Sequence, residues 1–237
     1  MTTDGDRAAP VVIAAGFALM ERMPGDPPIR LEQLDGSADG RRFSPSAGRN
    51  QQHIVDALVE LLPDRGVCLE VASGTGEHGV LAATRLPQWR WIPSERDADA
   101  LVSIEAWVEH AGLANLDRPR RLDLGDPWPF EPESLDAVFA SNLMHIAPIE
   151  TTDALFQGAA RHLKRGASLL VYGAVFLPGT QRPEGNRGFD ADLRGRDPSY
   201  GVRELTTLAQ IAARAGLGAP QVRSMPADNV ILRLPKP

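Results

Sequence analysis

The sequence contains a single cysteine, Cys68, among 237 residues. One thiol cannot form an internal disulfide, and a cysteine-based zinc site needs several, so both are excluded. Because Cys68 lies within an apolar run, we expect its thiol to be buried and inert. Basic residues are in deficit, with 25 Lys and Arg against 31 Asp and Glu and a formal net charge of −6. Without a basic surplus to neutralise phosphates, the composition argues against nucleic acid as a main partner.

Long apolar runs and compact clusters of metal ligands are also missing. The most apolar early stretch, residues 8–20, is too short to cross a bilayer and follows Asp4 and Asp6 rather than a basic leader. We therefore expect a cytoplasmic protein without a membrane partner. The five histidines are scattered, so we predict no metal site and expect His78 on a helix surface.

The composition is that of a soluble globular protein, with 43% hydrophobic and 24% charged residues. The length suits one domain plus an extension. Residues 1–43 are rich in Pro, Gly, Asp and Arg and form the predicted N-terminal extension, while residues 44–237 form the main domain. An ordered strap and a loose tail are both open for the extension, with the tail favoured.

Hydrophobic periodicity predicts strands and helices in alternation through the main domain. Helices are expected over residues 50–62, 76–86, 97–111, 150–163 and 204–215, and strands over 67–71, 89–93, 122–124, 136–141 and 168–175. Alternation of this kind is typical of an α/β fold, a parallel sheet with helices on both faces. Two further β-prone runs, 221–225 and 230–234, flank a turn-rich link. We therefore predict seven strands, mostly parallel, with a C-terminal antiparallel hairpin.

The most informative segment is residues 67–79, an apolar strand that leads directly into a glycine turn and a helix. Gly74 and Gly76 allow a sharp turn and a close approach of the backbone to a ligand. The N–H groups at the start of the helix suit a carboxylate or phosphate of a nucleotide-like cofactor. With Gly79 the segment spells G-x-G-x-x-G, a pattern that also fits a nicotinamide-dependent enzyme. Glu70 before the turn, the lack of room for a second domain and the closing hairpin weigh against that alternative.

Acidic or polar residues lie at the ends of three later strands, at the edge where ligands bind in open α/β sheets. Glu95 ends the second strand and is placed to chelate a ribose diol, although a solvated loop acid is the alternative. Asp123 follows the third strand and could accept a hydrogen bond from an adenine amino group or simply form a turn before Gly125. Asn142 and His145 leave the fourth strand. His145 could act as a base toward a methyl acceptor, or pack as a satisfied histidine.

Residues 186–200 are polar and aromatic, and we expect a long loop there that serves as a lid or a substrate-binding loop. Its arginines, Arg194 and Arg196, could grip a substrate carboxylate or pair with nearby acids such as Asp190 and Asp197. Candidate substrate contacts in and before this loop are His145, Tyr172, Asn186, Asp190, Arg194 and Tyr200.

Several stretches together resemble one family. They are SPSAGRN (44–50), LEVASGTG (69–76), NLMH (142–145), FDADLR (189–194), RDPSYGVR (196–203) and MPADN (225–229). The chain resembles the class I S-adenosylmethionine-dependent methyltransferases, and more narrowly the methyltransferase-like protein 26 family, from about residue 44 to the C-terminus. The resemblance implies a Rossmann-like methyltransferase fold and S-adenosylmethionine as the cofactor. Two positions depart from the superfamily pattern: Ala72 replaces the common first glycine, and Lys164-Arg-Gly-Ala167 replaces Lys-Pro-Gly-Gly.

The resemblance also implies which residues bind the cofactor. The turn after the first strand would hold the methionine end, Glu95 the ribose and Asp123 the adenine. The first helix would close over the cofactor, and its Arg49 and Asn50 would contact the cofactor or the substrate. The full set of candidate cofactor contacts is Arg49, Asn50, Glu70, Ala72, Ser73, Gly74, Gly76, Glu95, Asp123, Leu124 and Asn142.

These inferences together predict a methyltransferase that acts on a small molecule by in-line methyl transfer. Aligning the acceptor with the methyl group would then be the main task of the protein. Two alternatives remain at this point: a non-catalytic protein that uses the same fold for binding, and a nicotinamide-dependent oxidoreductase. The sequence is consistent with a small-molecule partner and does not exclude a homodimer.

Overall fold

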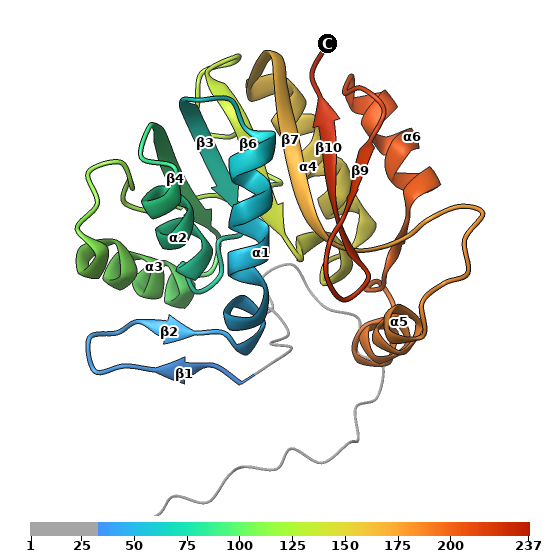
Figure 1. The fold of residues 1–237 in the computed structure, drawn as a ribbon, viewed down its shortest axis with the longest axis horizontal. Helices are drawn as coiled ribbons and strands as arrows, with labels where there is room; N and C mark the ends of the chain where they lie inside the picture. The colour runs from blue at the N-terminus through green and yellow to red at the C-terminus, as the bar shows by residue number, and fades with distance from the viewer. Residues whose placement is uncertain (1–32) are drawn as a thin grey trace, which may run out of the picture.

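A computed structural model of the chain describes residues 33–237 and gives the fold drawn in Figure 1. Residues 1–32, most of the predicted extension, lie outside the described residues. The helices are α1 (Pro45–Leu61), α2 (Glu77–Arg85), α3 (Ala98–Ala111), η1 (Leu143–His145, a 3-10 turn), α4 (Ile149–His162), α5 (Glu184–Arg196) and α6 (Leu205–Ala215). The strands are β1 (Asp35–Gly36), β2 (Arg42–Phe43), β3 (Gly66–Val71), β4 (Trp89–Glu95), β5 (Arg120–Arg121), β6 (Leu135–Ser141), β7 (Leu163–Phe176), β8 (Arg203–Glu204), β9 (Gln221–Ser224) and β10 (Asn229–Pro235).

One sheet organises the domain, with strand order β5-β4-β3-β6-β7-β10-β9 and with β8 paired beside β7. The pairs β5/β4, β4/β3, β3/β6 and β6/β7 are parallel, while β10 is antiparallel to both of its neighbours. The predicted fold class, a mostly parallel sheet that closes with an antiparallel hairpin, is confirmed. Because β3 and β6 are adjacent although helices and strands separate them in sequence, the chain order reverses there. Ligands bind at such a switch point in open α/β sheets.

Each face of the sheet buries its own hydrophobic core. The helices α1 and α2 cover one face, where Leu58, Trp91 and Phe139 are fully buried, and α4 and α6 cover the opposite face (Figure 1). Cys68 lies in the first of these cores with no exposed surface, and burial raises the pKa of its thiol. The expectation that the cysteine is buried is thereby confirmed, and a raised pKa disfavours the reactive thiolate form.

The first helix begins earlier than its apolar pattern predicts. The hydroxyl of Ser44 accepts a hydrogen bond from the N–H of Ala47 at 3.1 Å, and Pro45 occupies the first helical position. Both features are favourable at a helix N-terminus. The additional turn matters for the site because it places Arg49 and Asn50 within a regular helix rather than at its frayed end.

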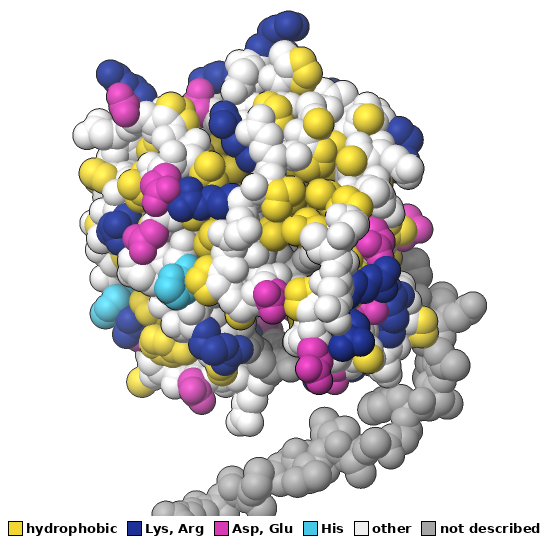
Figure 2. Space-filling view, turned by 45° about the vertical axis from the view of Figure 1, so that its right-hand side comes forward, with side chains coloured by type: hydrophobic (Ala, Val, Ile, Leu, Met, Phe, Trp, Pro, Cys, Tyr) yellow, Lys and Arg dark blue, Asp and Glu magenta, His cyan; other side chains and the backbone are white. Residues whose placement is uncertain are grey.

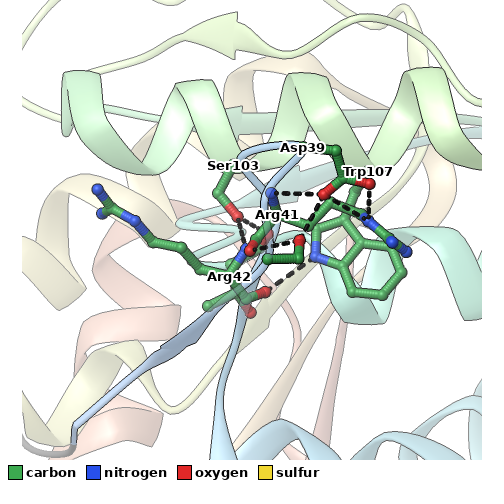
Figure 3. Close-up of polar contacts among 7 residues, drawn as sticks. Asp39, Arg41, Arg42, Ser103 and Trp107 are labelled. Atoms are coloured by element: carbon green, nitrogen blue, oxygen red, sulfur yellow. Dashed lines mark hydrogen bonds and ion pairs between the residues drawn. The ribbon is translucent and has the colours of Figure 1, made fainter. Parts of the chain in front are cut away.

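A small hairpin, β1–β2, packs against α3 at the carboxyl-end side of the sheet (Figure 1). Figure 3 shows how it is held: the Ser103 hydroxyl accepts a hydrogen bond from the N–H of Arg42 at 2.9 Å, and the Trp107 indole N–H donates to the Arg42 carbonyl at 2.9 Å. The Arg41 guanidinium lies 4.8 Å from the centre of the Trp107 ring. Ser103 also donates to the carbonyl of Thr75 at 2.8 Å. The hairpin is therefore connected to the glycine turn through one buried hydroxyl.

The long loop predicted over residues 186–200 is wrong. Residues 184–196, most of the expected loop, form the helix α5. Two ion pairs one helical turn apart, Asp190 with Arg194 at 3.1 Å and Asp192 with Arg196 at 3.0 Å, stabilise it. Residues 164–166 lie at the start of β7, directly after α4. No helix within residues 33–237 has the length and apolar character needed to span a bilayer.

Candidate functional site

The glycine turn between β3 and α2 is the centre of the candidate site. Gly74 and Gly76 have φ angles of +59° and +99°, which favour glycine. No atom would lie within 4 Å of a Cβ added at Gly74, whereas one at Gly76 would lie 3.1 Å from the backbone of Ile104. Gly76 is therefore required for packing against α3. Gly74 faces open space and offers its backbone to a ligand.

Ala72 adopts a left-handed conformation, with φ of 54°, at the position where the resembled superfamily has glycine. This conformation costs a residue with a Cβ about 1 kcal/mol or more. The turn nevertheless keeps its shape because Ser73 braces it: the Ser73 N–H donates to the Ser94 carbonyl at 2.9 Å, and the Ser73 hydroxyl accepts from the Ser94 N–H at 3.1 Å. The hydroxyl group of Ser73 therefore stabilises the turn itself.

Glu70 is buried under the turn rather than exposed along it. One of its carboxylate oxygens accepts a hydrogen bond from the indole N–H of Trp91 at 2.8 Å. A Cβ added at Gly79 would lie 2.8 Å from the same oxygen, so Gly79 makes room for this carboxylate. Burial raises the pKa of Glu70 to about 7. This carboxyl group therefore titrates near neutral pH.

Glu95 lies at the end of β4 with its carboxylate directed at the glycine turn. Its oxygens accept hydrogen bonds from the N–H groups of Gly74 at 3.1 Å, Arg96 at 2.7 Å and Asp97 at 3.3 Å. The residue is 9% exposed, and burial raises its pKa. A carboxylate held in this way next to an open backbone position suits a diol ligand.

Asp123 lies one strand further along the same edge and is exposed. Its carboxylate accepts from the N–H of Gly125 at 3.0 Å and lies 3.9 Å from the Arg96 guanidinium. It therefore forms the turn that follows β5, and it retains accessible oxygen surface. Leu124 beside it is half-buried and packs against the core of the α4 face.

On the other side of the switch point lie Asn142, the N-cap residue of η1, and His145, the last residue of η1. Asn142 has φ of 59°, and its N–H donates to the Tyr172 carbonyl at 2.9 Å. His145 is 2% exposed, and the Phe189 ring from α5 forms a T-shaped contact with its imidazole, with the centroids 5.1 Å apart. Burial, together with the charge of Arg203, lowers the pKa of His145 to about 4. The imidazole is therefore neutral at physiological pH, and its Nδ1 has no hydrogen-bond partner among the described residues.

The candidate substrate residues within the segment that was predicted as a loop lie on or beside α5. Asn186 is 6% exposed and donates to the Asp228 carbonyl in the β9–β10 turn at 2.9 Å. Asp190 holds Arg194 and also accepts from the N–H of Val202 at 2.8 Å. Tyr200 is buried, as is Val202 two residues further along the chain. Basic and acidic side chains are mixed on the face drawn in Figure 2, and α5 follows that pattern with its internal ion pairs.

His78 differs from its predicted placement on a helix surface. It is half-buried, and its Nε2 lies 2.9 Å from Oδ1 of Asn50 on α1. Burial lowers the pKa of His78 to about 4. Sequence reasoning missed this contact because the register between α1 and α2 was unknown. Among residues 33–237, no three His, Cys, Asp or Glu side chains are grouped so that they could hold a metal ion.

Comparison with known proteins places this site in a family. Residues 41–236 match the family described as "Protein of unknown function (DUF938)". The chain belongs to this family. The match includes the glycine turn, η1, α5 and the closing hairpin, and it excludes only one residue at the C-terminus.

Solved structures of methyltransferases share the fold of this DUF938 protein. An O-methyltransferase family 2 protein from Planctomyces limnophilus, in complex with apigenin, matches with a TM-score of 0.68 and 21% identity over 81% of this chain and 58% of its own. Human N-acetylserotonin methyltransferase, in complex with SAM, gives 0.65 and 15% over 81% and 52%. Geranyl diphosphate C-methyltransferase from Streptomyces coelicolor A3(2) gives 0.64 and 13% over 80% of each chain. The DUF938 chain thus spans little more than half the length of the first two proteins, and the likeness is one of fold.

Proposed function

We propose that this DUF938 protein is an S-adenosylmethionine-dependent methyltransferase that acts on a small molecule. One observation carries the proposal: the Glu95 carboxylate lies 3.1 Å from the N–H of Gly74, at the carboxyl edge of the sheet and beside open space. A ribose diol fits such a carboxylate, and the glycine backbone admits the chain that joins the ribose to the methionine end. The methyltransferases that share the fold, several of them crystallised with SAM or SAH, support this assignment.

Described residues along the carboxyl edge of the sheet fit each part of S-adenosylmethionine. Glu95 would hold the ribose, Asp123 and Leu124 would flank the adenine, and the turn at Ala72 and Gly74 would lie along the methionine end. Arg49 is exposed on α1 and has no ion pair among the described residues, so it is available for the cofactor carboxylate. When bound, S-adenosylmethionine supplies an activated methyl group.

The residues of η1 and α5 would position the acceptor. The neutral imidazole of His145 adds no positive charge next to a cationic cofactor, which is favourable for binding. A pKa of about 4 makes His145 a weak base, so it would assist only acceptors that lose a proton readily. Alignment by Phe189, Asn186 and Tyr200 would then contribute most to the rate.

Calorimetric titration with S-adenosylmethionine, S-adenosylhomocysteine and NAD tests the proposal. Micromolar binding of the first two ligands without binding of NAD is expected. Binding of NAD alone would favour an oxidoreductase. Absence of binding by all three would favour a non-catalytic role for the fold. The narrower resemblance to methyltransferase-like protein 26, a cytoplasmic location and a homodimer belong to the same proposal and rest on the sequence.

A further inference from the structure

The β2–α1 junction, residues 42–44, reaches the glycine turn through a side chain of α3. The N–H of Arg42 donates to the Ser103 hydroxyl at 2.9 Å (Figure 3), and this hydroxyl donates to the carbonyl of Thr75 at 2.8 Å. Thr75 lies between the two glycines of the turn. Because a hydroxyl can accept and donate at once, one side chain connects the backbone of the junction to the backbone of the turn.

A second bridge runs through Glu77, the first residue of α2. One of its carboxylate oxygens accepts from the N–H of Ser44 at 2.7 Å and from the hydroxyl of Thr75 at 2.8 Å. A carboxylate is favourable in the first turn of a helix, next to the positive end of the helix dipole. Thr75 is therefore held at its carbonyl by one bridge and at its hydroxyl by the other, and both bridges begin at the junction.

The extended backbone of the junction explains why both bridges reach one residue. N–H groups two residues apart point to the same side of an extended chain, so those of Arg42 and Ser44 both face the turn. The ring of Phe43, between them, makes a T-shaped contact with Trp107 of α3, with the centroids 5.1 Å apart. These contacts dock the junction on α3 and on the glycine turn together.

Both bridges are buried, and they support a turn that is costly to fix. Ser103 has no exposed surface, so it cannot contact a bound ligand, and its influence on binding must pass through the groups to which it bonds. Glu77 is 8% exposed. Gly74 and Gly76, on either side of Thr75, have positive φ angles, and glycine loses the most conformational entropy when its backbone is fixed. A turn that is fixed before the ligand arrives avoids that cost on binding.

We propose that Ser103, Glu77 and Thr75 are positioning residues that hold the glycine turn in its ligand-binding form, so that docking of the β2–α1 junction and binding of the cofactor strengthen each other. The inference rests on the proposed function, which places S-adenosylmethionine against this turn. By thermodynamic linkage, the junction gains from the bound cofactor the same free energy that it contributes to cofactor affinity. A merely structural role predicts lower stability with unchanged affinity.

The decisive variant is Ser103→Ala, because Ser103 cannot touch the ligand. The matched control is Ser168→Ala on β7, where a serine that is 6% exposed accepts a hydrogen bond from Arg233 at 3.1 Å. Thermal unfolding first defines the temperature range in which each variant is folded. Calorimetric titration should then show that Ser103→Ala binds S-adenosylhomocysteine about fivefold or more weakly, and Ser168→Ala within about twofold of the wild type. Wild-type affinity of Ser103→Ala, or an equal loss in both variants, overturns the proposal.

A pair of variants at Thr75 tests the other bridge, and it decides the question if Ser103→Ala does not fold. Thr75→Val keeps the shape of the side chain but removes the hydroxyl that donates to Glu77, whereas Thr75→Ser keeps that hydroxyl. The valine variant should bind S-adenosylhomocysteine about fivefold or more weakly, and the serine variant within about twofold of the wild type. Equal affinities of the two variants overturn the proposal.

Hydrogen exchange followed by NMR measures the reciprocal effect. Saturating S-adenosylhomocysteine should slow exchange of the Arg42 and Ser44 N–H groups, which are the donors at the start of the two bridges. In Ser103→Ala the slowing at Ser44 should be smaller, although this N–H keeps its own acceptor. Unchanged exchange of both groups on saturation of the wild type overturns the proposed coupling.

Failure of the proposed function would be visible separately, as a wild-type protein that does not bind S-adenosylhomocysteine. The positioning role is then judged without ligand, from exchange of Gly74 and Gly76, whose N–H groups both donate hydrogen bonds within the site. Exchange of these two groups should be faster in Ser103→Ala, or in Thr75→Val relative to Thr75→Ser, and unchanged in Ser168→Ala. Wild-type exchange rates in the turn of Ser103→Ala and Thr75→Val would show that the bridges do not hold it.

Discussion

The carboxylate of Glu95 accepts a hydrogen bond from the backbone N–H of Gly74, with 3.1 Å between Oε2 and N. This contact joins the end of β4 to the turn after β3, so the acidic residue and the glycine turn form one unit. A ribose diol would bind the outer side of this carboxylate. The other oxygen is held by the backbone N–H groups of Arg96 and Asp97, which fixes its orientation before a ligand arrives.

The first prediction follows from this geometry. Glu95→Gln should weaken binding of S-adenosylhomocysteine about tenfold or more, since two hydrogen bonds from hydroxyls to a charged acceptor are worth about 1.5–3 kcal/mol each. Asp123→Asn should have a smaller effect because Asp123 is exposed. Calorimetric titration measures both affinities, with Glu131→Gln, an exposed change away from the glycine turn, as the control. Equal affinity of Glu95→Gln and wild type would contradict a ribose at Glu95.

A second prediction compares two substitutions in the glycine turn. Ala72→Gly should raise the free energy of unfolding by up to about 1 kcal/mol, because Ala72 has φ of 54°. Gly74→Ala should lower it by about 1 kcal/mol, since Gly74 has φ of +59° but free space around it. Urea unfolding measures both changes.

The affinity for S-adenosylhomocysteine should distinguish the two variants. Gly74→Ala should abolish binding of S-adenosylhomocysteine despite its small cost in stability, because the added methyl group would occupy the ligand's space. Ala72→Gly should bind normally. If Gly74→Ala binds as well as the wild type, the ligand does not lie against this turn.

The succession of strands along the chain, and the edge of the sheet at which the candidate residues lie, could be predicted from the sequence because both depend on local patterns. The apolar run ending at Val71, the glycines after it and Glu95 each lie near a strand end, and parallel strands bring those ends to one edge. The sheet order at the switch point, β3 beside β6, rested on the resemblance to methyltransferases rather than on periodicity.

The errors arose where tertiary contacts decide the structure. Residues 184–196 are polar with little apolar periodicity, yet α5 forms because ion pairs one turn apart and the packing of Phe189 on His145 stabilise it. The placement of His78 depended on how α1 lies against α2, which no local pattern specifies. Its partner Asn50 is 28 residues away in the sequence.

Glu70 gives a pH-dependent prediction. Burial raises its folded-state pKa from 4.5 to about 7, so this group stabilises the folded state below pH 4.5 and the stabilisation is lost as pH rises through 7. Glu70→Gln, which cannot ionise, should therefore be more stable than the wild type by up to about 3 kcal/mol at pH 8.5. The difference should shrink toward pH 5.

Urea unfolding at several pH values measures this difference directly. His78 and His145, whose pKa values are lowered to about 4, act in the opposite direction, losing stability as pH falls below 6.5. The contribution of these histidines is the same in the wild type and in Glu70→Gln, so it cancels in the difference between their free energies of unfolding. A constant difference between pH 5 and pH 8.5 would show that Glu70 does not titrate as described.

The hairpin contact through Ser103 can be tested separately from ligand binding. Ser103 has no exposed surface and bridges the N–H of Arg42 and the carbonyl of Thr75. Ser103→Ala should lower the free energy of unfolding by about 1–3 kcal/mol, since both backbone groups lose their partner. Hydrogen exchange should accelerate in residues 35–43. Val102→Ala, at a residue 62% exposed on the same helix, is the control and should leave exchange in the hairpin unchanged.

Arg203 gives the last prediction, because it holds the turn that carries His145. Its guanidinium donates to the carbonyls of Met144 at 2.8 Å and Ser199 at 2.9 Å, and also to that of Ala147. Lysine keeps the charge but lacks the planar fork that reaches several acceptors at once. Arg203→Lys should therefore lower the free energy of unfolding by about 1–3 kcal/mol, since buried carbonyls lose their partners. NMR should show a changed environment of the His145 ring.

The control is Arg214→Lys. In the wild type, a guanidinium nitrogen of Arg214 lies 3.2 Å from Oδ1 of Asp153 in an exposed ion pair, and lysine keeps the positive charge there. Exposed pairs contribute little, so this variant should unfold within about 0.5 kcal/mol of the wild type. If Arg203→Lys leaves both the stability and the His145 signals unchanged, the turn is rigid without the guanidinium. The position of His145 would then be set by its packing against Phe189 and by the hydrogen bond from the N–H of Gly201 to its carbonyl at 3.0 Å.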